Sequence, residues 1–328
     1  MRKHVSNHQR ERYVAAIVVI LGAMAVALLC WRAAGDTTGN GQHAQAATSS
    51  SASTDSATTA ANKKRSIIQE NLQNYLDKVT ADGDASVSFY SLDATSGSSA
   101  DSTTDQLTYG DGQIVADSNA TTTATSASTY KLFIAAYLFH LHQEGKFSWT
   151  TANKSGFYQM VVNSSNTFPE EILAEYGADS INAFIKSQGW SSPVFHDGDE
   201  AASTTSQSLR KVLQALNAGT GAFSDSSDRS YLLGLMQKQV YRSGIPAGVA
   251  SVDSGATVAD KVGFLDDVNN DAAIVTTSDG HKYILVIMTH GHNQTTLDFI
   301  RIKTIAAKVQ QIVYGSDAGT KVVSYSAD

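Results

Sequence analysis

Ser128 and Lys131 are the two residues whose types and spacing most directly suggest chemistry. They lie three positions apart at the start of a helix-like segment, and such a spacing places two side chains on one helix face. A buried lysine can lose its proton near neutral pH and then accept the proton of a serine hydroxyl. The backbone N–H of Ser128, at a helix start, is a natural donor to an oxyanion. The pair therefore predicts a serine nucleophile activated by a lysine base.

The spacing alone is not specific, because Ser208 and Lys211 repeat it. A serine at a helix start is most often a cap, and the lysine after it is most often solvated. The context separates the two pairs. Ser128 precedes residues 129–144, the most apolar helix-length segment of the folded part, whereas Ser208 lies near the start of an ordinary amphipathic helix. We therefore assign the nucleophile to Ser128.

Two further polar triplets follow Lys131 in a fixed order. Residues 164–166 read Ser-Ser-Asn and fall in a polar break between predicted helices, where a hydroxyl could relay a proton and an amide could hold a substrate amide. Residues 261–263 read Lys-Val-Gly and precede a terminal hairpin. A lysine at a strand edge can bind a substrate carboxylate, and a glycine there lets a substrate backbone approach closely. Similar triplets at 154–156 and 180–182 begin or enter helices, so the order and context of the motifs carry the prediction.

The elements that must position these residues are predicted from the hydrophobic pattern. Helical spacing over 65–79 precedes an alternating strand over 85–92. Strands over 272–277 and 283–289, joined by a Ser-Asp-Gly turn, predict a hairpin before a last helix over 295–314. A weak strand is predicted near 113–116, and helices are predicted over 157–163, 167–176, 178–188, 205–217 and 227–239. The order predicts an α+β fold, with an antiparallel sheet from both chain ends and an inserted all-helical block.

These motifs together resemble those of the class A β-lactamase family, within the penicillin-recognising serine enzymes, whose signature is Ser-x-x-Lys, Ser-Asp-Asn and Lys-Thr-Gly. Residues 128–136, 160–167, 244–248 and 260–275 are similar to the corresponding family segments. The resemblance covers about residues 65–315. It implies a β-lactamase/transpeptidase-like fold and acyl-enzyme chemistry on β-lactams or peptidoglycan-like amides.

The resemblance also implies catalytic roles. Ser128 would be the acylated nucleophile, Lys131 its base, and Ser164 a proton shuttle toward the leaving group.

On the substrate side, the resemblance implies that Asn166 holds the substrate amide, while Lys261 and Gly263 border the binding strand. The backbone N–H groups of Ser128 and Phe264 would form the oxyanion hole.

Three departures from the family pattern concern the outcome after attack. Ser165 replaces the usual aspartate. Val262 replaces a threonine or serine whose hydroxyl helps to bind a substrate carboxylate, a hydrogen bond worth about 1.5–3 kcal/mol. The loop between Gly189 and Ser206 lacks the Glu-x-x-Leu-Asn motif whose glutamate activates water to release the acyl group.

Other carboxylates do not replace that glutamate in the sequence. Asp197, Asp199 and Glu200 lie in the right region but are expected to be solvated loop charges. Glu170 and Glu171 follow Asn166 closely and are expected to face outward on the next helix. The sequence therefore predicts a protein that is readily acylated but releases the acyl group slowly.

The N-terminal region predicts an anchor and a tether. Basic residues precede an uncharged apolar run over 13–31, which is long enough to span a bilayer with its N-terminal side in the cytoplasm. A cleaved signal peptide is the alternative. We predict residues 1–35 to be the cytoplasmic tail and anchor, 36–64 a disordered Ser/Thr/Ala-rich linker, and 65–320 an extracytoplasmic hydrolase domain at the cell membrane.

Composition narrows the partners. The net charge of −7 and the lack of a basic run beyond the N-terminus argue against nucleic acid. The single cysteine, Cys30, allows no internal disulfide. We expect a monomer without a cofactor. Metal is not expected either, because His140 and His142 point apart on a helix, and His290 and His292 have no evident third ligand.

Two classes of function remain open on the sequence. One is an active serine acyl-enzyme hydrolase, which the five polar residues of the three motifs favour. The other is a catalytically degenerate cell-wall-binding or scaffolding module on the same fold, which the missing glutamate and Val262 favour.

Overall fold

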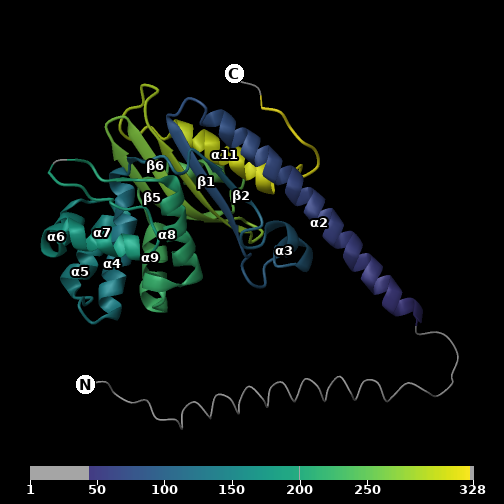
Figure 1. Ribbon diagram of the computed structural model, residues 1–328, viewed down its shortest axis with the longest axis horizontal. Helices are drawn as coiled ribbons and strands as arrows, with labels where there is room; N and C mark the ends of the chain where they lie inside the picture. Colours follow the sequence, from purple (N-terminus) through teal and green to yellow (C-terminus); the bar gives the residue numbers. More distant parts are fainter. Residues whose placement is uncertain (1–43, 199, 326–328) are drawn as a thin grey trace, which may run out of the picture. The chain divides into compact units, whose positions relative to one another are not determined.

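The computed structural model describes residues 44–198 and 200–325 (Figure 1). The predicted anchor over 1–35 lies outside the described residues. Within the described part, the structure contains no helix that combines the length and apolarity needed to span a bilayer. The chain divides into Met1–Ser53 and Thr54–Asp328, and the account below concerns the second unit.

A five-stranded antiparallel sheet organises this unit, with the strand order β2-β1-β7-β6-β5. The N-terminal strand β1 pairs with β7 near the C-terminus over its whole length, so both chain ends build the sheet, as predicted. The strands are β1 (Ala85–Leu92), β2 (Val115–Ser118), β5 (Thr257–Leu265), β6 (Val268–Thr276) and β7 (Lys282–Thr289). The edge strand β5 carries the predicted Lys-Val-Gly motif.

Both faces of the sheet are covered, because alternate residues of each central strand point to opposite sides. On β7, Ile284 and Val286 belong to a core cluster shared with the helical block. Tyr283 and Leu285 belong to a second cluster shared with helices from the chain ends. The result is a three-layer α+β architecture, which agrees with the predicted fold class.

The helical block lies on one side of the sheet (Figure 1). Its central helix α4 is buried nearly all round, as its continuous apolar sequence predicts. The block comprises the 3₁₀ helix η1 (Ala127–Tyr130), α4 (Lys131–Gln143), α5 (Thr151–Val162), α6 (Thr167–Tyr176), α7 (Ala178–Ser187), α8 (Ser206–Ala218), the 3₁₀ helix η2 (Gly221–Phe223) and α9 (Ser226–Met236). A short sheet of β3 (Ala124–Thr125) and β4 (Ser203–Thr204) ties the segment before η1 to the loop before α8.

The other side of the sheet is covered by α10 (Ile245–Ala250), α11 (Ile300–Tyr314) and the C-terminal part of α2 (Ala44–Val79). A further helix, α3 (Thr103–Tyr109), precedes β2. The structure differs from the predicted domain boundary, because residues 44–64, expected in a disordered linker, belong to α2. The segment is rich in alanine, the best helix former, and Ala61 is buried. The composition-based prediction overlooked that packing.

Candidate active site

Ser128 lies in η1, the tight turn that leads into α4. Ala127, just before it, has φ of 42°, a left-handed conformation that costs free energy for a residue with a Cβ. The turn is held by its surroundings, since Asn270 of β6 donates its side-chain N–H to the carbonyl oxygens of Thr125 and Ser126 at 2.9 and 3.1 Å. Ser128 itself is half-buried, so its hydroxyl remains reachable.

Lys131 connects the predicted site residues. Its Nζ donates to Ser128 Oγ at 2.8 Å, to the carbonyl oxygen of Ser164 at 2.6 Å and to Asn166 Oδ1 at 2.7 Å. These three bonds use every N–H of an ammonium group. The side chain is 1% exposed, and this burial lowers the pKa of Lys131 to about 8, although the charge of Glu170 acts in the opposite direction. A lysine with this pKa holds a substantial neutral fraction near physiological pH.

Ser164 lies between two lysine amines. Its carbonyl oxygen accepts from Lys131, and its Oγ accepts from Lys261 Nζ at 2.8 Å. A φ of 57° at Ser164 turns the chain so that the carbonyl and the hydroxyl both face the amines. The predicted Ser-x-Asn element and the Lys-Val-Gly strand therefore meet at the predicted nucleophile.

Lys261 is fully buried on β5 and also donates to the carbonyl oxygen of Val262 at 2.8 Å. Burial, assisted by the nearby charge of Lys131, holds its pKa well below the ordinary lysine value. The sequence analysis expected this amine to border the substrate-binding strand. In the structure it lies on β5, and its Nζ contacts Ser164 Oγ.

Gly263 allows β5 to pass beside the nucleophile turn. A Cβ at this position would lie 2.7 Å from the carbonyl oxygen of Ser126 and 2.9 Å from the backbone nitrogens of Ser128 and Thr129. Phe264 follows on the same strand and is half-buried. The backbone of Phe264 therefore adjoins that of Ser128, as a two-donor oxyanion hole requires.

Val262 was expected to leave the site without a hydroxyl that helps to bind a substrate carboxylate, but its side chain lies elsewhere. Its side chain is fully buried in the cluster that contains Ile245 and Val249 of α10. Because side chains alternate along a strand, it points away from the face on which Lys261 meets Ser164. A hydroxyl at position 262 would lie on this face beside Asp271, its cross-strand partner on β6, so the expected loss of a substrate hydrogen bond is not supported.

Two buried carboxylates next to Lys261 and Val262 in the sheet were not predicted from the sequence. Asp271 of β6 is fully buried and accepts from the backbone N–H of Ile245 at 2.8 Å, and burial raises its pKa to about 7. Asp260 of β5 is paired with Arg242, and burial together with Asp271 raises its pKa well above the ordinary value. Asp260 and Asp271 interrupt otherwise apolar strands, and this pattern in the sequence could have revealed the buried carboxylates.

Glu170 has a position that the sequence predicted only in part. It is exposed, but it also lines a cavity of about 410 Å³ together with Tyr130, and its charge acts on Lys131. It is therefore exposed, as expected, and it also borders the candidate site, which the sequence did not predict. In the loop, Asp197 is exposed and Asp199 lies outside the described residues, while Glu200 lines the same cavity.

The competing motifs are structural. Ser208 is buried on α8, and its Oγ accepts from the backbone N–H of Ser191 at 3.0 Å. Asn182 of α7 accepts from the backbone N–H groups of Val194 and Phe195 at 2.9 and 3.1 Å, which holds the loop before β4. Neither motif reaches Ser128 through these contacts.

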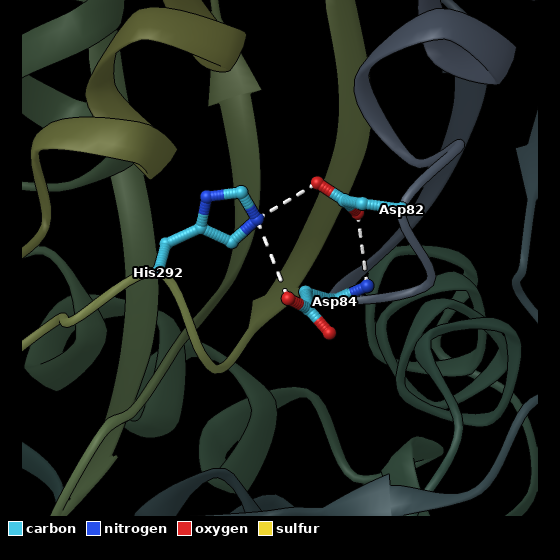
Figure 2. Close-up of side chains that lie close together, drawn as sticks. All are labelled: Asp82, Asp84 and His292. Atoms are coloured by element: carbon cyan, nitrogen blue, oxygen red, sulfur yellow. Dashed lines mark hydrogen bonds and ion pairs between the residues drawn. The ribbon is translucent and has the colours of Figure 1, made fainter.

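Figure 2 shows a cluster of one histidine and two aspartates, His292, Asp82 and Asp84, which lies outside the site. His292 Nε2 lies 2.8 Å from Asp82 Oδ2 and 3.3 Å from Asp84 Oδ2, so the two carboxylates that the sequence did not reveal adjoin this histidine. Arg301 donates to the same Asp82 oxygen at 2.7 Å. The cluster is thus an ion-pair network that joins the start of β1 to the segment after β7. His140 and His142 take separate partners, Glu144 and Asp228.

Residues 156–314 match the sequence model described as the Beta-lactamase enzyme family. A point mutant of PBP-A, solved as an acyl-enzyme complex with penicillin G, has a TM-score of 0.58 and 19% identity, over 74% of this chain and 95% of that chain. A β-lactamase from Sphaerobacter thermophilus has a TM-score of 0.57 and 17% identity, over 74% of this chain and 96% of that chain. A representative of class A β-lactamase from Bacteroides cellulosilyticus has a TM-score of 0.57 and 15% identity, over 76% of this chain and 97% of that chain. The predicted resemblance is therefore confirmed at the level of the fold, which is that of β-lactamases and PBP-A. No curated protein matches the sequence.

This β-lactamase-like fold explains why β5, η1 and the loop after α5 converge. The matched family segment includes residues 164–166 and 261–263 but begins after Ser128 and Lys131. The assignment of the nucleophile therefore rests on the contacts described above.

Proposed function

We propose that the protein is an acyl-serine hydrolase in which Ser128 is acylated by a β-lactam or a peptidoglycan-like amide. The observation that carries the proposal is the contact between Lys131 Nζ and Ser128 Oγ at 2.8 Å, made by a buried amine whose pKa is lowered to about 8. A neutral amine at this distance can act as a general base.

In the proposed step, neutral Lys131 accepts the Ser128 proton while Oγ attacks the carbonyl carbon of the amide. The developing oxyanion accepts from the backbone N–H groups of Ser128 and Phe264. Collapse breaks the C–N bond. The leaving nitrogen takes a proton from Ser164 Oγ, which is replenished from a lysine amine, so that an acyl ester remains on Ser128. The donation from Lys261 Nζ to Ser164 Oγ at 2.8 Å supports this last transfer, whereas Lys131 Nζ contacts the Ser164 carbonyl oxygen and not its hydroxyl.

We also propose that release of the acyl group is slow. Among the described residues, the hydrogen bonds of Lys131 go to Ser128, Ser164 and Asn166, and none goes to a carboxylate. Glu170 is the carboxylate whose charge acts on Lys131, but it is not one of these hydrogen-bond partners, so a water molecule attacking the ester lacks a carboxylate base held in this network.

Intact-mass spectrometry after incubation with penicillin G tests the proposal. The wild type should gain a stable mass of one acyl group, and Ser128→Ala should gain none. Ser208→Ala, which removes the other serine with a lysine three residues later, is the matched control and should still label. Rapid turnover without an adduct would contradict slow release. No adduct and no turnover would support the second candidate, a degenerate wall-binding module, which the absent Glu-x-x-Leu-Asn motif favours.

The location is a further part of the proposal. The uncharged apolar run over 13–31, preceded by basic residues, supports a single membrane anchor with the hydrolase domain on the extracytoplasmic side, near cell-wall substrates. Deletion of residues 1–35 should move the protein from the membrane fraction to the soluble fraction. Equal membrane retention of both forms would argue against the anchor.

A further inference from the structure

Glu170 lines a cavity whose other lining residues include aromatic and aliphatic side chains. Its volume is about 410 Å³. The rings of Tyr130 and Phe195 border it in an edge-to-face pair, with 5.6 Å between their centroids. Aliphatic side chains complete the wall, namely Leu173, Ala178 and Ala202. The cavity is therefore large enough and apolar enough to receive a substituent of a substrate.

Two carboxylates, Glu170 and Glu200, line the same cavity. In the part of the chain that the structure describes, neither lies within ion-pair distance of a basic side chain. His196 also lines the cavity, and its Nε2 lies 2.8 Å from Ser203 Oγ. The negative charges are therefore available to a bound group, and two of them at one cavity disfavour an anionic occupant.

The cavity adjoins the acylation site. Glu170 follows Asn166 by four residues, which is about one helical turn or roughly 6 Å along the axis of α6. Asn166 Oδ1 accepts from Lys131 Nζ at 2.7 Å, and Tyr130 lies two residues after Ser128. A substituent on an acyl group bound at Ser128 can therefore enter the cavity beside Tyr130 and Glu170, and Glu200 lines the same cavity.

On the basis of the proposed acylation of Ser128, we infer that this cavity binds a protonated amine carried on the acyl side of the substrate. The preferred substrates are thus amine-bearing β-lactams or peptides. Glu170 and Glu200 pair with the ammonium group, and the faces of Tyr130 and Phe195 add cation–π attraction. Together these groups favour a cationic substituent over a neutral one of the same shape.

Ampicillin and penicillin G test the inference, because their side chains differ by one amino group. At about pH 6.5, where this α-amino group is protonated, the wild type should be acylated about five-fold faster by ampicillin than by penicillin G. A ratio of about five-fold is the upper end of what one exposed ion pair contributes. The double variant Glu170→Gln with Glu200→Gln should bring the ratio of the two rates close to one. Glu171→Gln, an exposed neighbour on α6 that does not line the cavity, is the control and should keep the wild-type ratio.

Equal rates in the wild type, or a preference that survives in the double variant, would overturn the inference. The ratio also cancels any effect of Glu170 on Lys131, because that effect applies to both compounds. Ser128→Ala separates this inference from the proposed function. Its equilibrium binding of the two compounds, measured by calorimetry, requires no acylation. Tighter binding of ampicillin supports the cavity, whereas equal affinity rejects it, even if neither compound acylates the wild type.

Discussion

At the scale of single residues, Lys131 combines two properties that oppose each other. Its three hydrogen bonds to Ser128, Ser164 and Asn166 stabilise the ammonium form, whereas its burial favours the neutral amine. Burial prevails, and the pKa falls to about 8. The residue can therefore position the nucleophile when protonated and activate it when neutral.

The rate of acylation should follow the ionisation of Lys131. Below its pKa the amine is protonated and cannot accept the Ser128 proton, so the rate should rise with pH and level off above about 8. Lys131→Arg, which stays protonated throughout, should not be acylated at any pH. Rates of adduct formation measured across this range provide the check. A profile that is flat through pH 8 would exclude Lys131 as the base.

Sequence reasoning located the residues of the site better than it located their contacts. The order of the motifs predicted Ser128, Lys131 and Ser164 as site residues, and the structure brings these three together. The bond between Lys261 and Ser164 depends on how β5 packs against the loop after α5. The approach of Glu170 to Lys131 likewise depends on helix packing, which no short pattern encodes.

At the scale of elements, the decisive contact is the passage of β5 alongside η1. The strand can come this close only because Gly263 has no side chain to meet the backbone of Ser126, Ser128 and Thr129. Elements with strong periodicity, such as β1 and α4, were predictable. The start of α2 was not, since its polar and alanine-rich sequence carries little hydrophobic signal.

Gly263→Ala should separate catalysis from folding. The added Cβ would meet backbone atoms at 2.7–2.9 Å, which must push β5 away from the nucleophile turn. A displacement of about 1 Å at a reacting centre costs about 10²-fold in rate, so acylation should fall by this order. Gly234→Ala on α9, where a Cβ meets no atom within 4 Å, is the matched control and should acylate like the wild type. Comparable rates for both variants would refute this role of Gly263.

At the scale of the whole unit, β7 belongs to both hydrophobic clusters at once. Ile284 contributes to the layer beneath the helical block, and Leu285 contributes to the layer beneath α11. Neither helical layer can lose its contact with β7 without weakening the same sheet. The two layers should therefore unfold together.

Truncation on either face of β7 tests this coupling. Ile284→Ala and Leu285→Ala each remove a fully buried side chain and should each lower the free energy of unfolding by about 2–5 kcal/mol. Urea titrations followed by circular dichroism and by tryptophan fluorescence should give one coincident transition in both variants. Transitions that separate in only one of them would show that the layers are independent.

The pairing of β1 with β7 also has a consequence for the newly made chain. The paired residues are roughly two hundred positions apart, so closure of the sheet must wait until β7 has been synthesised. Before then, β1 and β2 form at most a two-stranded pair, which is marginal in water. β5 and β6 likewise gain their place in the sheet only when β7 arrives. A nascent chain that has not yet reached β7 therefore carries Ser128 without a closed sheet beside it, and acylation of Ser128 is expected only after β7 has been synthesised.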